Sequence, residues 1–384
     1  MVLEEPLVVE AGCVTLRKGT VVAGKAWEGP RLLRVAGEGT RVVLEGVRLR
    51  GGGVQVSQQA RLEMAQGGVV GCSSDGVVCE GGGDAELIGV EILGCLGQGA
   101  CVQGTGSKLV IQAGSIERCR ESGVVCNDGG KAEITEAQIA KCGRCGTVAM
   151  GPGSTLVVQG GHIQECRGAG VFCHTGGQAV VAGVGIQRIQ MGACVEGTGS
   201  KLAISKGHMQ RCAGGGVECS AGGTARLEDF TIEDCRGPGV VTHGGRVTVD
   251  GVAVEKCLMG GMKCSVGGRI DIHRSNIVGC HDSGISCMQS GIVEVLDTIV
   301  TGCGGWGVCV SHDTSFLVMT GGRISECKAG GLLSSNRGNA GLRNVEVVGC
   351  GGPGVERSRG GTVLMKDVRV DGNKLQVRGQ LWQG

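Results

Sequence analysis

The stretch KAEITEAQIAKCGRCGTVA, residues 131–149, contains one complete period of a pattern that recurs along most of this chain. Ala132 and Ile134 alternate with polar neighbours, Ile139 and Cys142 follow, and a glycine stands four residues after the cysteine. Short runs of alternating residues that end at Gly-rich bends are typical of strands. The stretch therefore predicts three short strands per period and leaves no room for a helix.

A ladder of cysteines carries this period along the chain, in steps of 22 to 24 residues. Four residues after most of them comes a glycine, and Ile189 takes the place of one cysteine. A fixed period of this length indicates a solenoid in which each period forms one turn. The ladder comprises Cys72, Cys95, Cys119, Cys142, Cys166, Cys212, Cys235, Cys257, Cys280, Cys303, Cys327 and Cys350.

In such a solenoid each strand pairs in parallel with its copy about 4.8 Å above. The pattern resembles the right-handed parallel β-helix of the pectin-lyase-like superfamily, whose short repeat is shared by the substrate-binding domain of certain F-box proteins. This resemblance covers residues 8–375 and implies one all-β domain of about 16 coils, each of roughly 23 residues. We expect less regular coils in residues 1–71, regular coils in residues 72–357, and the last coils with an end plug in residues 358–384.

Composition narrows the class of protein further. The chain has 79 Gly, 23 Cys, no Tyr and a formal net charge of +1, which gives no global case for binding nucleic acid or an anionic membrane. It has no apolar run of membrane-spanning length, and its first residues lack the pattern of a secretory signal. We therefore expect a reducing, cytoplasmic setting, such as a cytoskeletal or ciliary assembly.

The cysteines divide into two predicted classes. The ladder keeps step with an aliphatic residue three positions earlier, so we expect it to point inward as an inert thiol core without disulfides. A second set follows the repeat glycine by three residues, but Cys101, Cys194 and Cys309 follow it by only two. Because side chains alternate faces along a strand, we expect these three to be exposed and reactive thiols. The repeat glycines are expected to supply backbone angles that other residues adopt at a cost.

The sequence predicts no catalytic residues, no metal site and no cofactor. The catalytic signatures of polygalacturonases, pectate lyases and mannuronan epimerases are absent, and His281-Asp282 and His312-Asp313 occupy different places in their periods. The single CxxC, Cys142 to Cys145, has no second ligand pair at zinc-ribbon distance. Sugar subsites usually rely on aromatic faces, which this chain scarcely offers.

Three tryptophans have candidate structural roles. Trp27 and Trp382 lie near the two ends of the sequence, where we expect them to plug the exposed ends of the core. Trp306 lies at a corner, and the sequence leaves open whether it anchors a partner or covers the neighbouring coil. Neither end carries the amphipathic helix that commonly caps such solenoids, so end-on contacts with a partner are also expected.

An outward column two residues past the repeat glycine is apolar over six consecutive coils. Stacked apolar residues on a face that should be wet mark an interaction surface. The alternatives are that another part of the chain covers the column, or that β-branched residues merely suit a strand. The predicted partner-binding residues are Val78, Cys101, Val125, Val148, Phe172 and Cys194, together with Trp306.

These observations predict a non-enzymatic, rigid solenoid scaffold that binds other proteins. The alternative is a carbohydrate-active enzyme, a polysaccharide lyase, hydrolase or epimerase, whose site is not recognisable in the sequence. Such an enzyme should show a groove over one sheet with two carboxylates, or a carboxylate and a base, about 5–10 Å apart. A thiol-based sensor would instead need basic side chains around Cys101, Cys194 or Cys309.

Overall fold

The computed structural model describes residues 1–24 and 29–378. It is all-β, a parallel β-solenoid of about 16 turns with roughly 23 residues per turn, and the described residues form no helix. The predicted fold class and repeat length are therefore confirmed. The chain divides into two compact units, Met1–Gln190 with Gly199–Leu202 and Met191–Thr198 with Ala203–Gly384, which are called the first and second units below.

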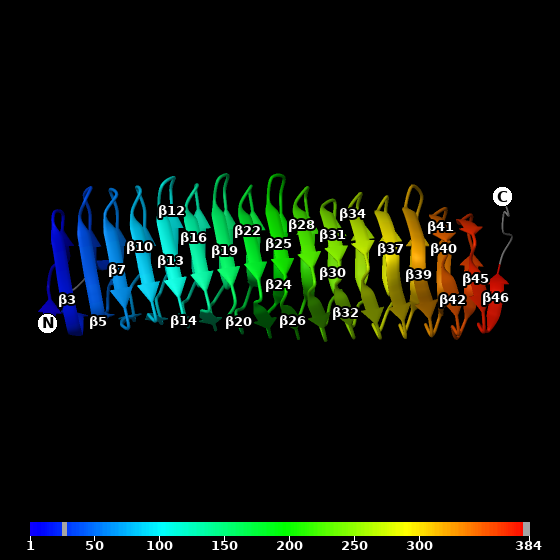
Figure 1. The fold of residues 1–384 in the computed structure, drawn as a ribbon, viewed down its shortest axis with the longest axis horizontal. Helices are drawn as coiled ribbons and strands as arrows, with labels where there is room; N and C mark the ends of the chain where they lie inside the picture. Colours follow the sequence, from blue (N-terminus) through cyan, green and yellow to red (C-terminus); the bar gives the residue numbers. More distant parts are fainter. Residues whose placement is uncertain (25–28, 379–384) are drawn as a thin grey trace. The chain divides into compact units, whose positions relative to one another are not determined.

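Each regular turn contributes one strand to sheet B and then two strands, separated by a corner, to sheet A (Figure 1). In the first unit the alternating stretch quoted above forms β16, Lys131–Thr135, and β17, Gln138–Ala140, in sheet A. Ile134 pairs with Ile111 below it and with Val158 above it, so identical positions of successive turns stack. This register stacks the core residues of one turn on the residues at equivalent positions of the neighbouring turns.

The strands of the first unit follow this order. Sheet B contains β2 (Leu7–Val9), β4 (Arg31–Val35), β6 (Gly53–Val56), β9 (Val77–Cys79), β12 (Ala100–Gln103), β15 (Val124–Asn127), β18 (Thr147–Met150) and β21 (Ala169–His174). Besides β16 and β17, sheet A contains β1 (Val2–Leu3), β3 (Cys13–Ala23), β5 (Arg41–Arg50), β7 (Arg61–Ala65), β8 (Gly68–Val70), β10 (Asp84–Ile88), β11 (Glu91–Leu93), β13 (Lys108–Gln112), β14 (Ser115–Glu117), β19 (Thr155–Gln159), β20 (His162–Gln164), β22 (Gln178–Ala182) and β23 (Gly185–Gln187).

The second unit repeats the scheme, and β25 (Lys201–Ser205) falls at the division between the units. Sheet B contains β24 (Met191–Glu196), β27 (Gly215–Ser220), β30 (Val240–His243), β33 (Met262–Ser265), β36 (Ile285–Met288), β38 (Trp306–Ser311), β40 (Gly330–Ser335), β43 (Pro353–Arg357) and β46 (Leu375–Arg378). Sheet A contains β26 (His208–Gln210), β28 (Thr224–Glu228), β29 (Thr231–Glu233), β31 (Arg246–Asp250), β32 (Ala253–Glu255), β34 (Arg269–His273), β35 (Asn276–Val278), β37 (Ile292–Thr301), β39 (Phe316–Ser325), β41 (Asn339–Arg343), β42 (Glu346–Val348), β44 (Thr362–Lys366) and β45 (Arg369–Asp371).

The repeat glycines serve close packing and not the unusual backbone angles expected from the sequence. Gly123 does not have a positive φ, but a Cβ there would lie 2.5 Å from Ile139 Cγ2 and 2.6 Å from the carbonyl oxygen of Gly146. The left-handed conformation is adopted elsewhere, by Glu136 (φ 51°) at the corner within sheet A and by Lys141 (φ 58°) directly before the ladder cysteine. The expectation about the glycines is therefore corrected, because the next turn leaves no space for a side chain.

The cysteine ladder lies in the core, as predicted. Cys142 is fully buried, and its Sγ donates a hydrogen bond of 3.6 Å to the carbonyl oxygen of Ala140, at the end of the preceding strand. In the turn before it, Cys119 Sγ likewise donates a hydrogen bond of 3.7 Å to the carbonyl oxygen of Glu117. In the described residues these thiols form no disulfide. The ladder thus caps the short sheet A strands turn by turn.

Candidate functional site

The predicted apolar column is present on the outer face of sheet B in the first unit. Val78 pairs with Cys101, Cys101 with Val125, Val125 with Val148, and Val148 with Phe172. Five residues of five consecutive turns are thus in direct register, with Gln55 paired to Val78 before them. The remaining predicted member, Cys194, belongs to the second unit, where its register partner is Glu218.

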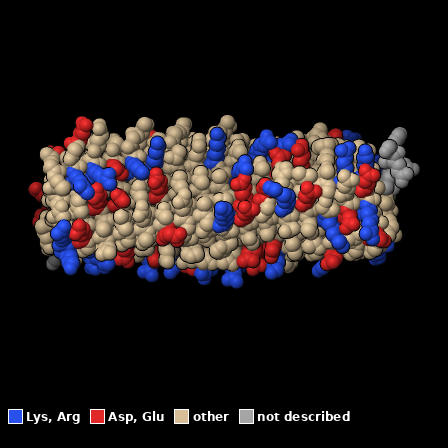
Figure 2. Space-filling view, viewed as in Figure 1, with Lys and Arg blue, Asp and Glu red and all other residues tan. Residues whose placement is uncertain are grey.

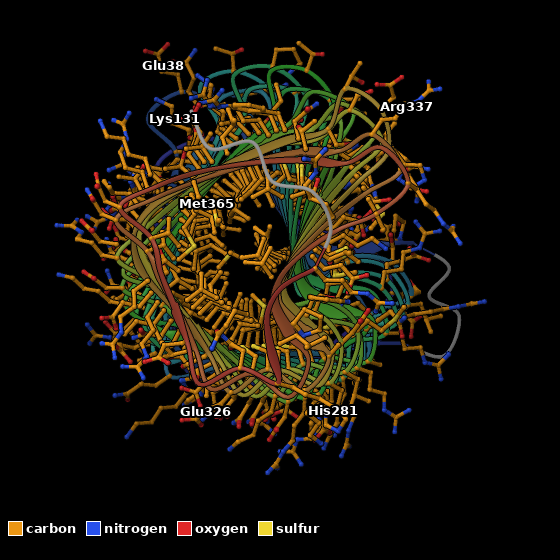
Figure 3. All side chains as sticks on the ribbon, turned by 90° about the vertical axis from the view of Figure 1, so that its right-hand side faces the viewer. Glu38, Lys131, His281, Glu326, Arg337 and Met365 are labelled. Atoms are coloured by element: carbon orange, nitrogen blue, oxygen red, sulfur yellow. The ribbon has the colours of Figure 1, made fainter. Side chains whose placement is uncertain are left out.

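This column is far less exposed than expected for a wet face. Val78, Val125 and Val148 are only 5%, 8% and 7% exposed, and Cys101 and Phe172 are half-buried. In the second unit, Figure 3 shows the ribbon of sheet B bending inward between the corner near His281 and the turn near Arg337. In the first unit, the low exposure of the three valines shows that neighbouring atoms cover most of the column. The expectation of a fully wet stripe is corrected to that of a recessed floor.

A polar rim borders the start of this floor. Gln103 Nε2 donates a hydrogen bond of 2.6 Å to Glu80 Oε2, and Gln55 Nε2 donates one to Glu80 Oε1. The Glu80 carboxylate is therefore held between two amides from the turns on either side. A hollow of about 580 Å³ opens here, lined by Gln55, Ser57, Gln58, Glu80, Gly81, Gln103, Gly104 and Asp128. No local sequence motif predicts this hollow, because its residues are spread over four turns.

The far end of the floor in the first unit is aromatic. The rings of Phe172 and His174 are stacked, with centroids 4.6 Å apart and an interplanar angle of 21°. Both side chains are half-buried on the outer face of β21. This pair offers a flat, partly exposed surface beside the aliphatic column.

The three thiols predicted to be exposed are half-buried instead. Cys101, Cys194 and Cys309 all have intermediate exposure, and among the described cysteines only Cys13 is exposed. Burial raises the pKa of the Cys101 thiol to about 12 and that of the Cys309 thiol to about 11. Since the thiolate is the nucleophile, these raised pKa values disfavour reactivity. The prediction of exposed, reactive thiols is corrected for this reason.

Trp306 covers its neighbouring turn. It begins β38, is half-buried and pairs with Gly330, where an added Cβ would lie 2.2 Å from a ring carbon of Trp306. The ring therefore packs directly on the backbone of the next turn, which favours the second of the two roles left open by the sequence. Trp27 and Trp382 lie outside the described residues.

The candidate catalytic pairs do not meet. Asp282 accepts a hydrogen bond of 3.5 Å from Ser283 at a corner before sheet B, whereas Asp313 forms an ion pair of 3.5 Å with Arg337 in a turn after sheet B. In the described part of the chain no three His, Cys, Asp or Glu side chains gather as a metal-binding group would. Nor do residues 1–24 and 29–378 contain a helix long and apolar enough to cross a membrane.

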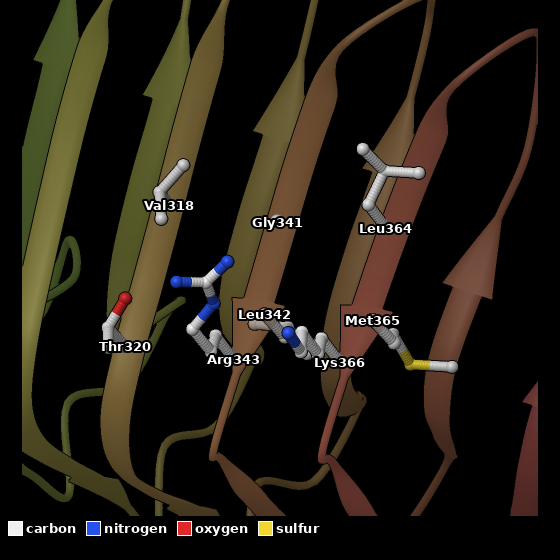
Figure 4. Close-up of a pocket in the computed structure, with 8 residues that line it drawn as sticks. All are labelled: Val318, Thr320, Gly341, Leu342, Arg343, Leu364, Met365 and Lys366. Atoms are coloured by element: carbon white, nitrogen blue, oxygen red, sulfur yellow. The ribbon is translucent and has the colours of Figure 1, made fainter. Parts of the chain in front are cut away.

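A further hollow, which the sequence did not predict, lies on sheet A of the second unit. It measures about 570 Å³ and is lined by Val318, Thr320, Gly341, Leu342, Arg343, Leu364, Met365 and Lys366 (Figure 4). The outward row of β39, β41 and β44 reads Val318, Gly341, Leu364, and the next row reads Thr320, Arg343, Lys366. The only signal in the sequence is a glycine in the middle of a strand.

The fold is a parallel β-solenoid, and the outer column of sheet B in its first unit is nearly buried. A family model described as the right handed beta helix region matches residues 52–207 and 215–375. The chain therefore belongs to the right-handed β-helix family, as the resemblance implied. No curated protein matches the sequence.

Several solved structures are similar to the chain at low identity. A tailspike protein of E. coli bacteriophage HK620, in complex with a hexasaccharide, has a TM-score of 0.42 and 10% identity, over 93% of this chain and 71% of that chain. Tailspike protein 2 of Escherichia coli O157:H7 bacteriophage CAB120 has a TM-score of 0.41 and 13% identity, over 67% of this chain and 38% of that chain. The catalytic unit of an alpha-1,3-glucanase from Streptomyces thermodiastaticus has a TM-score of 0.35 and 15% identity, over 97% of this chain and 64% of that chain. At TM-scores and sequence identities this low, no activity of these proteins can be assigned to the present chain.

Proposed function

We propose that the protein is a non-enzymatic solenoid scaffold that binds other proteins along the recessed face of sheet B. The observation that carries the proposal is the unbroken register of Val78, Cys101, Val125, Val148 and Phe172 over five turns of the first unit. Each turn presents an apolar side chain at the same outward place. A floor of this composition suits apolar side chains of a partner.

The apolar area of the column that is still exposed belongs mainly to Cys101 and Phe172, because Val78, Val125 and Val148 are nearly buried. Contact with an apolar group of a partner would remove the remaining area, mainly that of Cys101 and Phe172, from water. Phe172, half-buried and stacked on His174, is the bulkiest side chain of the column. Aromatic side chains often dominate binding energy at protein interfaces. Phe172 is therefore the residue whose change should matter most.

The test is affinity purification from the native source with three tagged chains: the unaltered protein, Phe172→Asp and Val180→Asp. Val180 is a matched control because it is 49% exposed on sheet A of the same unit, away from the floor. We expect the unaltered chain and Val180→Asp to recover one defined complex that Phe172→Asp loses, with equal melting temperatures for all three. Equal recovery by Phe172→Asp would refute the proposed binding face.

The hollow around Glu80 favours a second candidate, a carbohydrate-active site of the lyase, hydrolase or epimerase type. Its lining contains no apolar side chain and includes two carboxylates, Glu80 and Asp128. Amide and carboxylate groups are the hydrogen-bonding partners that sugar hydroxyls use. Turnover of a uronic-acid polymer by the purified protein, abolished by Glu80→Gln and kept by Glu133→Gln on sheet A, would establish this candidate and displace the scaffold proposal.

A further inference from the structure

A single strand position on sheet A of the second unit lacks a side chain without a steric reason. Gly341 lies in the middle of β41 and does not have a positive φ. A Cβ added there would meet only Val318 Cγ2, at 3.5 Å, which is an ordinary contact. Glycine weakens a strand interior, so its presence is a cost that the fold does not require. What Gly341 provides is space.

That space is a notch with apolar walls. Val318 and Leu364 flank Gly341 in the same outward row, and Figure 4 shows the vacant place between their side chains. Because neighbouring strands are about 4.8 Å apart, the two walls are separated by about 10 Å. Leu364 is 64% exposed and Phe316, at the start of β39, is 45% exposed. The notch therefore accepts one apolar side chain between two others.

Two unpaired cations border the notch. Arg343 and Lys366 are register partners in the row next to Gly341, and both are exposed. Among the described residues neither forms an ion pair, whereas Arg323 and Arg369, on β39 and β45, both pair with Glu346 at 3.7 Å. Like charges directly opposite each other on adjacent strands repel. A bound anion would relieve this repulsion.

The two strand rows that line the hollow do not supply that anion. On the face drawn in Figure 2, acidic and basic side chains are interspersed. The nearest acidic residue in the row of Gly341 is Glu294 on β37, which is already paired with Arg269 at 2.8 Å. Within the hollow's own lining there are two cations and no carboxylate. The charge complementarity of the site therefore points to an acidic ligand.

We propose that this hollow binds an extended segment of another protein that carries an apolar and an acidic residue two positions apart. The apolar side chain enters the notch above Gly341, and the carboxylate lies between Arg343 and Lys366. Alternate residues of an extended chain lie on one face about 6.6–6.8 Å apart, which is the same spacing that separates Gly341 from Arg343 along β41. A segment lying along β41 thus meets both features at once. This site is separate from the sheet B floor and does not depend on it.

The test is selection from a displayed library of random octapeptides on the immobilised full chain. We expect enrichment of sequences with an apolar residue and Asp or Glu two positions apart. Gly341→Val fills the notch and should remove the preference for the apolar residue. Arg343→Glu combined with Lys366→Glu should weaken binding of the enriched peptides by about tenfold or more and select basic residues in their place.

Matched controls keep the test decisive. Thr248→Val places the same side chain in the outward row of β31, and Lys263→Glu reverses a charge on sheet B, so both should select the same peptides as the unaltered chain. Melting temperatures of all variants show that they fold. An unaltered chain that enriches no such pattern would overturn the proposal. The proposal would also be overturned if the same peptides were enriched by Gly341→Val and by the Arg343→Glu, Lys366→Glu double variant. Two further results would contradict it: enrichment that appears only after removal of residues 379–384, and self-association of the chain through Leu364 in place of peptide binding.

Discussion

Cys126 Sγ donates a hydrogen bond of 2.9 Å to the carbonyl oxygen of Gly130, the residue that closes the turn between sheet B and sheet A. Cys264 and Cys287 repeat this contact with Gly268 and Gly291, at 3.0 and 3.1 Å. At the same place of a later turn, Ser334 Oγ donates to the Gly338 carbonyl oxygen at 2.7 Å. This second set of cysteines therefore satisfies buried turn carbonyls in addition to filling the core.

The first prediction is that serine can replace Cys126 in this hydrogen bond, as it does at Ser334, whereas alanine cannot. Cys126→Ser should change the free energy of unfolding by less than about 1 kcal/mol, because a hydroxyl can keep the bond, whereas Cys126→Ala should cost about 1–3 kcal/mol. Ala149, the register partner of Cys126, shows that the backbone accepts alanine here. Urea denaturation of both variants measures the difference. Equal losses would mean that the hydrogen bond contributes nothing to stability.

A second prediction concerns the repeat glycines. Gly123→Ala should destabilise the fold by about 1–3 kcal/mol, because the new Cβ collides with Ile139 and with the backbone of the next turn. Gly341→Ala is the matched control, since its Cβ meets no atom closer than 3.5 Å, and it should stabilise by up to about 1 kcal/mol. Thermal unfolding of the two variants measures the expected loss of stability in Gly123→Ala and the expected gain in Gly341→Ala. A harmless Gly123→Ala would refute close packing as the reason for the glycine ladder.

A third prediction is a loss of stability at alkaline pH. Burial raises the pKa of Cys126, Cys219 and Cys264 to about 11 and that of Cys287 to about 12, from an ordinary value of 9.0. Because the folded pKa lies above the unfolded one, this contribution to stability is fully present below pH 9 and is lost as the pH rises through 11. At pH 10, ionisation of each of these thiols in the unfolded chain should lower the free energy of unfolding by about 1 kcal/mol.

The melting temperature between pH 8 and pH 11 measures this effect. Replacing Cys126, Cys264 and Cys287 together by serine should flatten the decline, because serine does not ionise in this range. The same decline in the triple variant and the unaltered protein would show that other groups cause it.

A fourth prediction concerns thiol accessibility. Iodoacetamide at pH 7.5 should first modify Cys13, the exposed cysteine of the described residues, and should reach Cys101 and Cys309 slowly because burial raises the pKa of both. Intact-mass spectrometry over time should show one rapid adduct, and Cys13→Ser should abolish it. Rapid modification of Cys101 or Cys309 in the folded protein would contradict this placement.

Much of the fold could be predicted because its determinants are periodic in the sequence. Ile116, Ile139 and Ile163 recur with the cysteines and stack in direct register in the structure. One repeat therefore specifies its neighbours, since each strand pairs with its own copy. The reason for the glycines escaped this reasoning, because a distance such as that from Gly123 to Ile139 Cγ2 exists only once the turns are stacked.

The candidate surfaces were predicted only in part, and the division has a physical cause. Alternation along a strand determines which side of a sheet a residue occupies, so the sequence by itself determined the solenoid, its buried thiols and the outward column from Val78 to Phe172. Exposure on that outer side depends on sheet curvature and flanking loops, which no local pattern encodes. Tertiary structure alone therefore decided that the column is recessed, that Glu80 is held by Gln55 and Gln103, and that the vacancy at Gly341 lies beside two unpaired cations.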